Sequence, residues 1–127
     1  MTTTLRAWLV LFFFVMGGLT STNVTAQNYP SKPVTIVVPY GPGSGNDMIA
    51  REIGQRLTEQ LGVTFIVENK AGATGNIAMD YTAQAKPDGY TMMMAANALA
   101  ANMSLYKPMP FDAEKELVAI SLIGRVP

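Results

Sequence analysis

Apolar positions follow two alternating patterns along this chain, one typical of buried strands and one of amphipathic helices. Residues 34–38 (VTIVV) form an almost continuous β-branched run, which predicts a strand buried on both faces of a parallel sheet. From Ile49 to Leu61 an apolar residue recurs at every fourth position, which predicts a helix with one apolar face. We expect Asn46 or Asp47 to cap this helix and Gly62 to end it in the left-handed conformation.

The alternation of strand and helix continues through the next third of the chain. Residues 63–67 predict a second strand, and residues 77–85 predict a second helix that ends at the turn 87–89. Residues 90–95 predict a third strand, and after residues 97–101 the chain reads as irregular through Pro110. Asp112 is expected to cap a short turn, and residues 117–123 predict a fourth strand. The β-α-β-α-β order predicts an α/β fold with an open, mostly parallel sheet.

The N-terminal segment has the three-part pattern of an export signal. Arg6 precedes an apolar run over residues 7–19, and small or polar residues follow up to Ala26. The alternative is a retained membrane helix, but a span needs about 20 apolar residues and this run is interrupted at Gly17. We therefore expect residues 1–26 to be a signal peptide cleaved before Gln27, and residues 27–127 to act in the periplasm without a membrane segment of their own.

Composition excludes several chemistries. The 127 residues include no His and no Cys, so Ser-His-Asp and Cys-His catalysis, thiolate metal sites and disulfides are excluded. Asp47, Glu68, Asp88 and Asp112 are expected at a helix start, a strand end, a turn and a cap, and they form no catalytic set. With 9 basic and 9 acidic residues, the chain also lacks the positive charge that nucleic-acid binding needs. We expect no enzyme activity, no metal, no cofactor and no nucleic-acid partner.

The candidate chemistry lies in two glycine-rich loops. One loop, residues 41–46, follows the first strand, and the other, residues 72–76, follows the second strand. Both lead directly into predicted helices, at the sheet edge where open α/β folds bind ligands. Glycine lets backbone N–H groups approach a ligand, and the helix N-terminus supplies partial positive charge. The strand-to-helix connections that contain these loops hold one basic residue, Lys70, so a carboxylate suits them better than a polyphosphate.

A dinucleotide site is an alternative interpretation of the first loop. Gly41 and Gly43 begin a glycine fingerprint, and Glu68 ends the second strand where a ribose-binding acid would lie. However, Asn46 occupies the third glycine position, and Pro42 removes one amide from the turn. Export from the cytoplasm also argues against a dinucleotide.

Several spaced motifs also follow one another in an order typical of one family. They are Tyr29–Pro33, Val38–Tyr40, Gly43 with Asp47, Ala50–Arg51, Glu68–Asn69, Gly72–Ala73, Gly75–Ile77, Pro87–Thr91 and Leu105–Tyr106. Across residues 29–127 the chain resembles the tripartite tricarboxylate transporter receptors, which are Bug-type periplasmic solute-binding proteins. The resemblance implies a two-lobed α/β receptor that closes over a small organic acid and delivers it to inner-membrane transporter subunits.

The resemblance also implies a set of ligand-binding positions. In the family the two loops hold a carboxylate largely through backbone amides and ordered water. The family often has Ser, Thr or His after the third strand, where Asn97 is the polar candidate here. The implied ligand-binding residues are Tyr40, Gly43, Ser44, Gly45, Asn46, Asp47, Gly72, Ala73, Thr74, Gly75, Asn76 and Asn97.

The length of the chain departs from the family pattern. Family members are more than twice as long, so residues 27–127 are expected to form the N-terminal part of the first lobe, without the second lobe. Two interpretations stay open: part of a longer carboxylate receptor, or a truncated interaction module without a transport role that uses its exposed sheet edge for partners.

Overall fold

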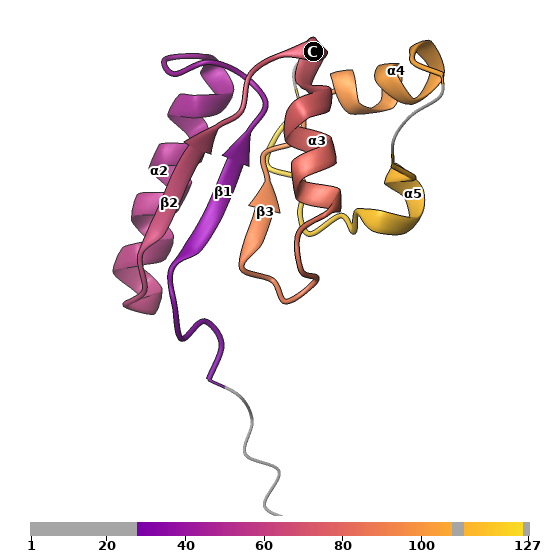
Figure 1. Ribbon diagram of the computed structural model, residues 1–127. Helices are drawn as coiled ribbons and strands as arrows, with labels where there is room; N and C mark the ends of the chain where they lie inside the picture. Colours follow the sequence, from indigo (N-terminus) through magenta and orange to yellow (C-terminus); the bar gives the residue numbers. More distant parts are fainter. Residues whose placement is uncertain (1–27, 108–110, 126–127) are drawn as a thin grey trace, which may run out of the picture.

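The computed structural model describes residues 28–107 and 111–125, and it contains a three-stranded parallel sheet (Figure 1). The strands are β1 (Val34–Val38), β2 (Phe65–Asn69) and β3 (Thr91–Met93). Their order across the sheet is β2-β1-β3, so β1 is central. The register aligns Val34 with Phe65, and Thr35 with Thr91. The predicted open, parallel α/β sheet is therefore confirmed. The predicted signal peptide, residues 1–26, lies outside the described residues.

Helix α2 (Gly45–Leu61) connects β1 to β2 and begins two or three residues earlier than predicted. Its cap is Ser44, whose backbone is extended and whose hydroxyl accepts a hydrogen bond from the Asp47 amide at 3.3 Å. The prediction of Asn46 or Asp47 as the cap is wrong, because Asp47 lies in the first turn and its carboxylate turns back to the Gly43 amide. Gly62 ends the helix in the left-handed conformation, with φ of 68°, as predicted.

The helices cover the two faces of the sheet. Ile36 and Val38 of β1 pack with Ala50 of α2 in a cluster that also contains Met94. Helix α3 (Asn76–Ala83), which connects β2 to β3, packs on the other face against β1 and β3 (Figure 1). This arrangement follows from two right-handed crossovers that run in opposite directions across the sheet, one from β1 to β2 and the next from β2 past β1 to β3. The central strand is consequently buried on both faces, as its almost continuous β-branched sequence predicted.

Two strands differ from the sequence prediction at both of their ends. β2 begins two residues later than expected, because residues 62–64 reverse the chain after α2. In the resulting frame Phe65 and Val67 pack toward the cluster under α2, while Ile66 is 48% exposed. β3 has three residues where six were predicted. The flanking ladder bonds, Thr35 N to Tyr90 O and Met94 N to Val37 O, extend its pairing by one residue at each end.

The region after β3 contains the largest departures. Helix α4 (Ala98–Leu105) occupies part of a stretch that was predicted to be irregular. Its sequence lacks an amphipathic pattern, but Ala, Leu and Met favour helix, and Asn102 attaches it to the rest of the fold. Helix α5 (Ala113–Glu116) is the predicted short turn, and Asp112 caps it by accepting a bond from the Glu114 amide.

The predicted fourth strand, residues 117–123, is not observed. Residues 117–125 have no regular secondary structure and pair with no strand among the described residues. Val118, Ile120 and Leu122 are 85%, 77% and 69% exposed. An alternating apolar pattern becomes a strand only when a neighbouring strand pairs with it, and no such pairing forms within residues 28–107 and 111–125.

Candidate ligand-binding site

The two glycine-rich loops lie side by side at the carboxyl edge of the sheet. Residues 39–44 connect β1 to α2 and residues 70–75 connect β2 to α3, and both helices begin at this edge (Figure 1). The loops also touch, because a Cβ added to Gly75 would lie 3.1 Å from the Pro39 Cβ. Two helix N-termini therefore supply partial positive charge to one edge, as an anion site requires.

The first loop presents backbone amides that the protein does not use. Gly43 has a φ of 82°, which lets the chain turn from β1 into the extended Ser44. Gly45 and Asn46 are the first two helical residues of α2. No hydrogen bond among the described residues uses their amides. These two N–H groups can therefore bind an anion at the start of α2.

Asp47 is a candidate residue whose carboxylate is already engaged by the protein. Its Oδ2 accepts from the Gly43 amide at 2.9 Å and from the Arg51 Nε at 3.0 Å. Its Oδ1 accepts from the Asn69 Nδ2 at 2.9 Å, and the side chain is 4% exposed. The Arg51 guanidinium, with the Gly43 and Asn69 donors, holds the pKa of Asp47 well below its usual value. Asp47 therefore shapes the loop, and its position is less suited to direct ligand contact.

Tyr40 contributes mainly through its backbone. Its side chain is half-buried against the apolar cluster under α2, and its carbonyl accepts a hydrogen bond from the Asn69 Nδ2 at 3.0 Å. The carbonyl bond attaches the first loop to the end of β2.

The second loop is a left-handed turn. The φ angles of Gly72, Ala73, Thr74 and Gly75 are 131°, 46°, 56° and 92°. Left-handed geometry costs a residue with a side chain about 1–2 kcal/mol, so Ala73 and Thr74 hold a strained backbone. Backbone strain of this kind is concentrated at ligand sites, where the surrounding structure maintains it. Ala73 and Thr74 are exposed residues, and their amides make no hydrogen bond within the described part of the chain.

Side chains of α4 and of Tyr106, the residue that follows it, contact this turn. The Asn102 Nδ2 donates to the Thr74 carbonyl and to the Asn76 Oδ1, both at 2.9 Å. The Tyr106 hydroxyl lies 3.1 Å from the Thr74 hydroxyl. The candidates Thr74 and Asn76 are thus fixed by a helix that the sequence pattern did not predict.

Both cations near the loops are already paired. Lys70 lies 2.7 Å from Glu68 and 3.9 Å from the centre of the Tyr81 ring, and the Glu68 carboxylate raises the pKa of Lys70. Arg51 is paired with Asp47 at 2.9 Å. An anion at this edge would therefore be held by amides and hydroxyls, as the sequence suggested. Among residues 28–107 and 111–125, no group of three or more acidic side chains is placed to hold a metal ion.

Asn97 lies at the point where the strand order reverses. The chain leaves β1 toward β2 on one side and returns to place β3 on the other side. Ligands of open α/β sheets bind beyond the strand ends at such a reversal. Asn97 follows β3 at this edge, is exposed, and makes no side-chain bond to the start of α4. Its side chain is therefore available to a ligand.

The structure adds residues that sequence reasoning did not place in the site. Asn69 and Arg51 join the first loop, and Asn102 and Tyr106 join the second. One signal for Asn69 was available, because it ends β2 directly before the second loop. Asn102 was harder to find, since its bonding partner Thr74 is 28 residues away in the sequence.

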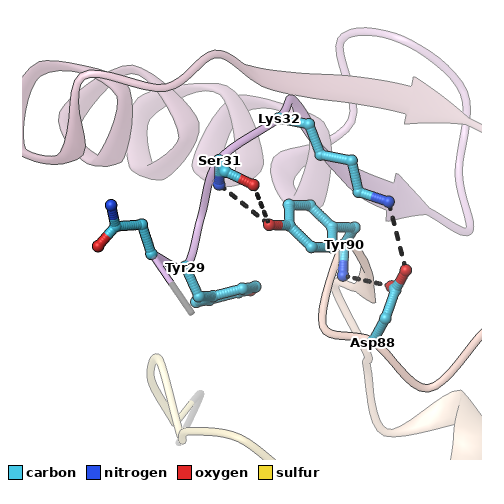
Figure 2. A pocket seen from close by; sticks show the side chains of 6 residues that line it. Tyr29, Ser31, Lys32, Asp88 and Tyr90 are labelled. Atoms are coloured by element: carbon cyan, nitrogen blue, oxygen red, sulfur yellow. Dashed lines mark hydrogen bonds and ion pairs between the residues drawn. The ribbon is translucent and has the colours of Figure 1, made fainter. Parts of the chain in front are cut away.

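A shallow pocket of about 580 Å³ lies at the opposite edge of the sheet (Figure 2). Tyr29 donates to the Gly89 carbonyl at 2.6 Å, the Ser31 amide donates to the Tyr90 hydroxyl at 3.0 Å, and Lys32 pairs with Asp88 at 3.4 Å. Figure 2 shows the bonds between Ser31 and Tyr90 and between Lys32 and Asp88. They attach the segment before β1 to the segment before β3, and they lie away from both glycine-rich loops.

Comparison with known proteins supports a specific family. The family described as tripartite tricarboxylate transporter family receptor matches residues 49–127. Protein BugT of Bordetella pertussis is 35% identical over 124 residues, which cover 96% of this chain and 38% of BugT. A UPF0065 protein of Bordetella bronchiseptica is 44% identical over 103 residues, which cover 80% of this chain and 31% of that protein. The chain thus spans about a third of the length of these relatives.

Solved structures of similar proteins support the same family. MatC of Rhodopseudomonas palustris, with bound malate, is 30% identical at a TM-score of 0.60, covering 69% of this chain and 30% of MatC. A TctC solute-binding protein from Polaromonas is 37% identical at a TM-score of 0.57, covering 62% of this chain and 28% of its own. An adipate-bound protein of R. palustris is 45% identical at a TM-score of 0.50, covering 51% and 22%.

Proposed function

Because the chain belongs to the tripartite tricarboxylate transporter family receptors, we propose that it supplies one wall of a receptor cleft for a small organic carboxylate. The resemblance noted from the sequence is thus confirmed at the level of the family. The family is one of receptors and not of enzymes, in agreement with the sequence prediction. Within this family the proposed role is to bind a ligand, to close over it with a second lobe and to pass it to a transporter.

One observation carries the proposal of an anion site. Unused amides of Gly45 and Asn46 lie at the same sheet edge as the unused amides of Ala73 and Thr74. The nearest cations, Arg51 and Lys70, are already paired with carboxylates. Amide groups arranged in this way suit a carboxylate, which accepts several N–H bonds and needs no counter-charge beyond two helix N-termini.

The relatives suggest the class of acid. MatC binds malate, and another R. palustris neighbour binds adipate. Both ligands carry two carboxylates, so one carboxylate could lie against each loop, or one against the loops and one against the second lobe. We infer a dicarboxylate of this size as the ligand class.

The ligand-binding positions on this wall are proposed as the two loops and the residue after β3. The first group comprises Tyr40, Gly43, Ser44, Gly45, Asn46 and Asp47, of which Gly45 and Asn46 are the strongest direct contacts. The second group comprises Gly72, Ala73, Thr74, Gly75 and Asn76. Asn97 completes the set at the end of β3.

Location and partners follow from the same proposal. We propose that residues 1–26 direct export and that residues 27–127 act in the periplasm, as the first part of the first lobe. None of the helices within the described residues is both long and apolar enough to cross a membrane. The partners would be a small organic acid and the inner-membrane subunits of a tripartite transporter.

A pair of substitutions at Gly45 tests whether the amides bind the ligand. Gly45→Pro removes one N–H at the first helical position, where proline is well tolerated. The preceding Ser44 already has the extended backbone that proline requires, with ψ of 159°, and a Cβ at position 45 meets nothing within 4 Å. Gly45→Ala keeps the N–H and serves as the matched control.

The measurement is titration calorimetry of the full-length protein, as purified from the periplasm, with malate, adipate and glucose. We expect heat with a dicarboxylate and none with glucose. Since a hydrogen bond to a charged group contributes about 1.5–3 kcal/mol, Gly45→Pro should weaken binding by about tenfold or more. Gly45→Ala should bind as the unchanged protein does. Binding of sugars or metal ions, with no heat from any organic acid, would contradict the proposal.

A second candidate function rests on the exposed segment 117–125. Val118, Ile120 and Leu122 present apolar side chains to solvent, as an interaction module would. Native mass spectrometry of the protein from its own host separates the two functions. A retained small acid supports the receptor, whereas a bound protein without any acid supports the module.

A further inference from the structure

Each of the two loops is held by the side-chain amide of an asparagine outside the loop. Asn69, the last residue of β2, donates from Nδ2 to the Tyr40 carbonyl at 3.0 Å and to the Asp47 Oδ1 at 2.9 Å. Its Oδ1 accepts from Arg51 at 3.1 Å. One side chain thus joins the end of β1, the first turn of α2 and the end of β2.

Asn102 of α4 does the same for the second loop. Its Nδ2 donates to the Thr74 carbonyl and to the Asn76 Oδ1, both at 2.9 Å. The residue is 1% exposed. In both cases one NH₂ group connects a loop carbonyl to a side-chain oxygen in the first turn of the following helix. We name these two arrangements the asparagine bridges, centred on Asn69 and Asn102.

We propose that Asn69 and Asn102 are positioning residues that fix the direction of the free loop amides before a ligand arrives. The short, uncharged side chain of asparagine supplies two donors from one nitrogen, which neither an aspartate nor a leucine can do. Fixing the loops beforehand removes the ordering cost that binding would otherwise carry. Neither residue is proposed to touch the ligand, and the binding part of the inference rests on the proposed function.

The strained second loop gives the strongest reason for such a device. Ala73 and Thr74 have φ angles of 46° and 56°, which residues with side chains avoid unless the surrounding structure holds them. The Asn102 bond to the Thr74 carbonyl is a direct restraint on that peptide group. Without it, we expect the turn to relax and the Ala73 and Thr74 amides to lose their common direction.

The first loop depends on its bridge for a different reason. Asp47 holds the Gly43 amide, and Asn69 is one of the groups that hold the Asp47 carboxylate in place. The Asp47 side chain is 4% exposed, so little water is present to replace the lost donor. Removal of Asn69 should therefore loosen the bond between Asp47 and Gly43.

The experiment compares Asn69→Leu and Asn102→Leu with a matched control in the full-length protein. Leucine has a similar size and no donor. The control is Thr58→Val, because the Thr58 hydroxyl accepts from the Phe65 amide at 3.0 Å and links α2 to the start of β2, away from the loops. Asn69→Ala and Asn102→Ala serve as second variants if a leucine variant does not fold.

Two readouts separate positioning from ligand binding. The first is native-state exchange of two amides that close the loops, Gly43 N to the Asp47 carboxylate and Gly75 N to the Gly72 carbonyl. We expect exchange about tenfold faster at Gly43 in Asn69→Leu and at Gly75 in Asn102→Leu, each loop responding to its own bridge. The second readout is affinity for malate or adipate, which should fall about tenfold in both variants.

Thr58→Val should lower the melting temperature but change neither the loop amide exchange nor the affinity. Unchanged exchange at Gly43 and Gly75 in the leucine variants would overturn the proposal, whether or not any acid binds. Faster exchange with unchanged affinity would show that the bridges do not serve binding and would also overturn it. Failure of the unchanged protein to bind any dicarboxylate would instead count against the proposed function, while the exchange result would still decide the positioning role.

Discussion

Substitution of Gly75 by alanine tests the geometry that brings the two loops together. Gly75 has φ of 92° and ψ of −5°, a left-handed conformation that disfavours a side chain. A new Cβ would also lie 3.1 Å from the Pro39 Cβ, and the rigid proline ring at the end of β1 can move little. The methyl group therefore meets both backbone strain and steric crowding.

The magnitude follows from these two contributions. The left-handed conformation costs an alanine about 1–2 kcal/mol, and overpacking of a well-packed site costs about 1–3 kcal/mol. Loss of glycine's freedom in the unfolded chain offsets about 0.4–1 kcal/mol of this. We expect Gly75→Ala to lower the free energy of unfolding by about 2–3 kcal/mol. For a domain of this size that corresponds to a melting temperature about 10 °C lower.

The control is the same covalent change at Gly54, inside α2. There a new Cβ would meet Ile36 and Phe65 at 3.5 Å, which are ordinary van der Waals distances. Alanine is about 1 kcal/mol more favourable than glycine in a helix interior, so Gly54→Ala should raise the stability by about that amount. Urea unfolding followed by circular dichroism measures both changes. If Gly75→Ala proves as stable as Gly54→Ala, the argument from backbone geometry is refuted.

Three further outcomes are expected. Because its partners hold the pKa of Asp47 below the usual 3.8, Asp47 stabilises the fold above that pH and loses this effect as pH falls below it. The difference in free energy of unfolding between the unchanged protein and Asp47→Asn, measured with urea, should therefore shrink from pH 7 to pH 3. A difference that stays constant would contradict the assignment. Tyr29→Phe removes the 2.6 Å bond to the Gly89 carbonyl and should lower the free energy of unfolding by about 1 kcal/mol. Ligand affinity should not change, because this contact lies at the opposite edge of the sheet from the loops. Calorimetry measures both the unfolding and the binding. Ile120 is 77% exposed, so Ile120→Asp should change the free energy of unfolding by less than about 0.5 kcal/mol. A loss of several kcal/mol would indicate instead that residues 117–123 form a buried strand.

The sequence by itself determined the elements whose signals are local. The β-branched run at 34–38 predicted β1 to the residue, because a strand buried on both faces needs apolar side chains on both. The four-residue repeat predicted α2, and Gly62 predicted its end. Once strand, loop and helix alternate in a parallel sheet, the loops after the strands must lie at one edge, so the candidate site could be placed as well.

Tertiary structure decided everything that depends on a distant partner. The cap shifted to Ser44 because the Asp47 carboxylate is held by Asn69 and Arg51. Helix α4 has no amphipathic pattern of its own, and residues 117–123 form no strand because no neighbour pairs with them within the described residues.

The asparagine bridges show the same division within the site. Asn69 bonds to a carbonyl 29 residues away, and Asn102 to one 28 residues away. An asparagine looks the same in the sequence whether it faces solvent or joins two segments. Sequence could therefore place the loops, since strand and helix order fixes their edge of the sheet. Only the folded structure identifies what holds them, because those hydrogen bonds form after distant segments have come together.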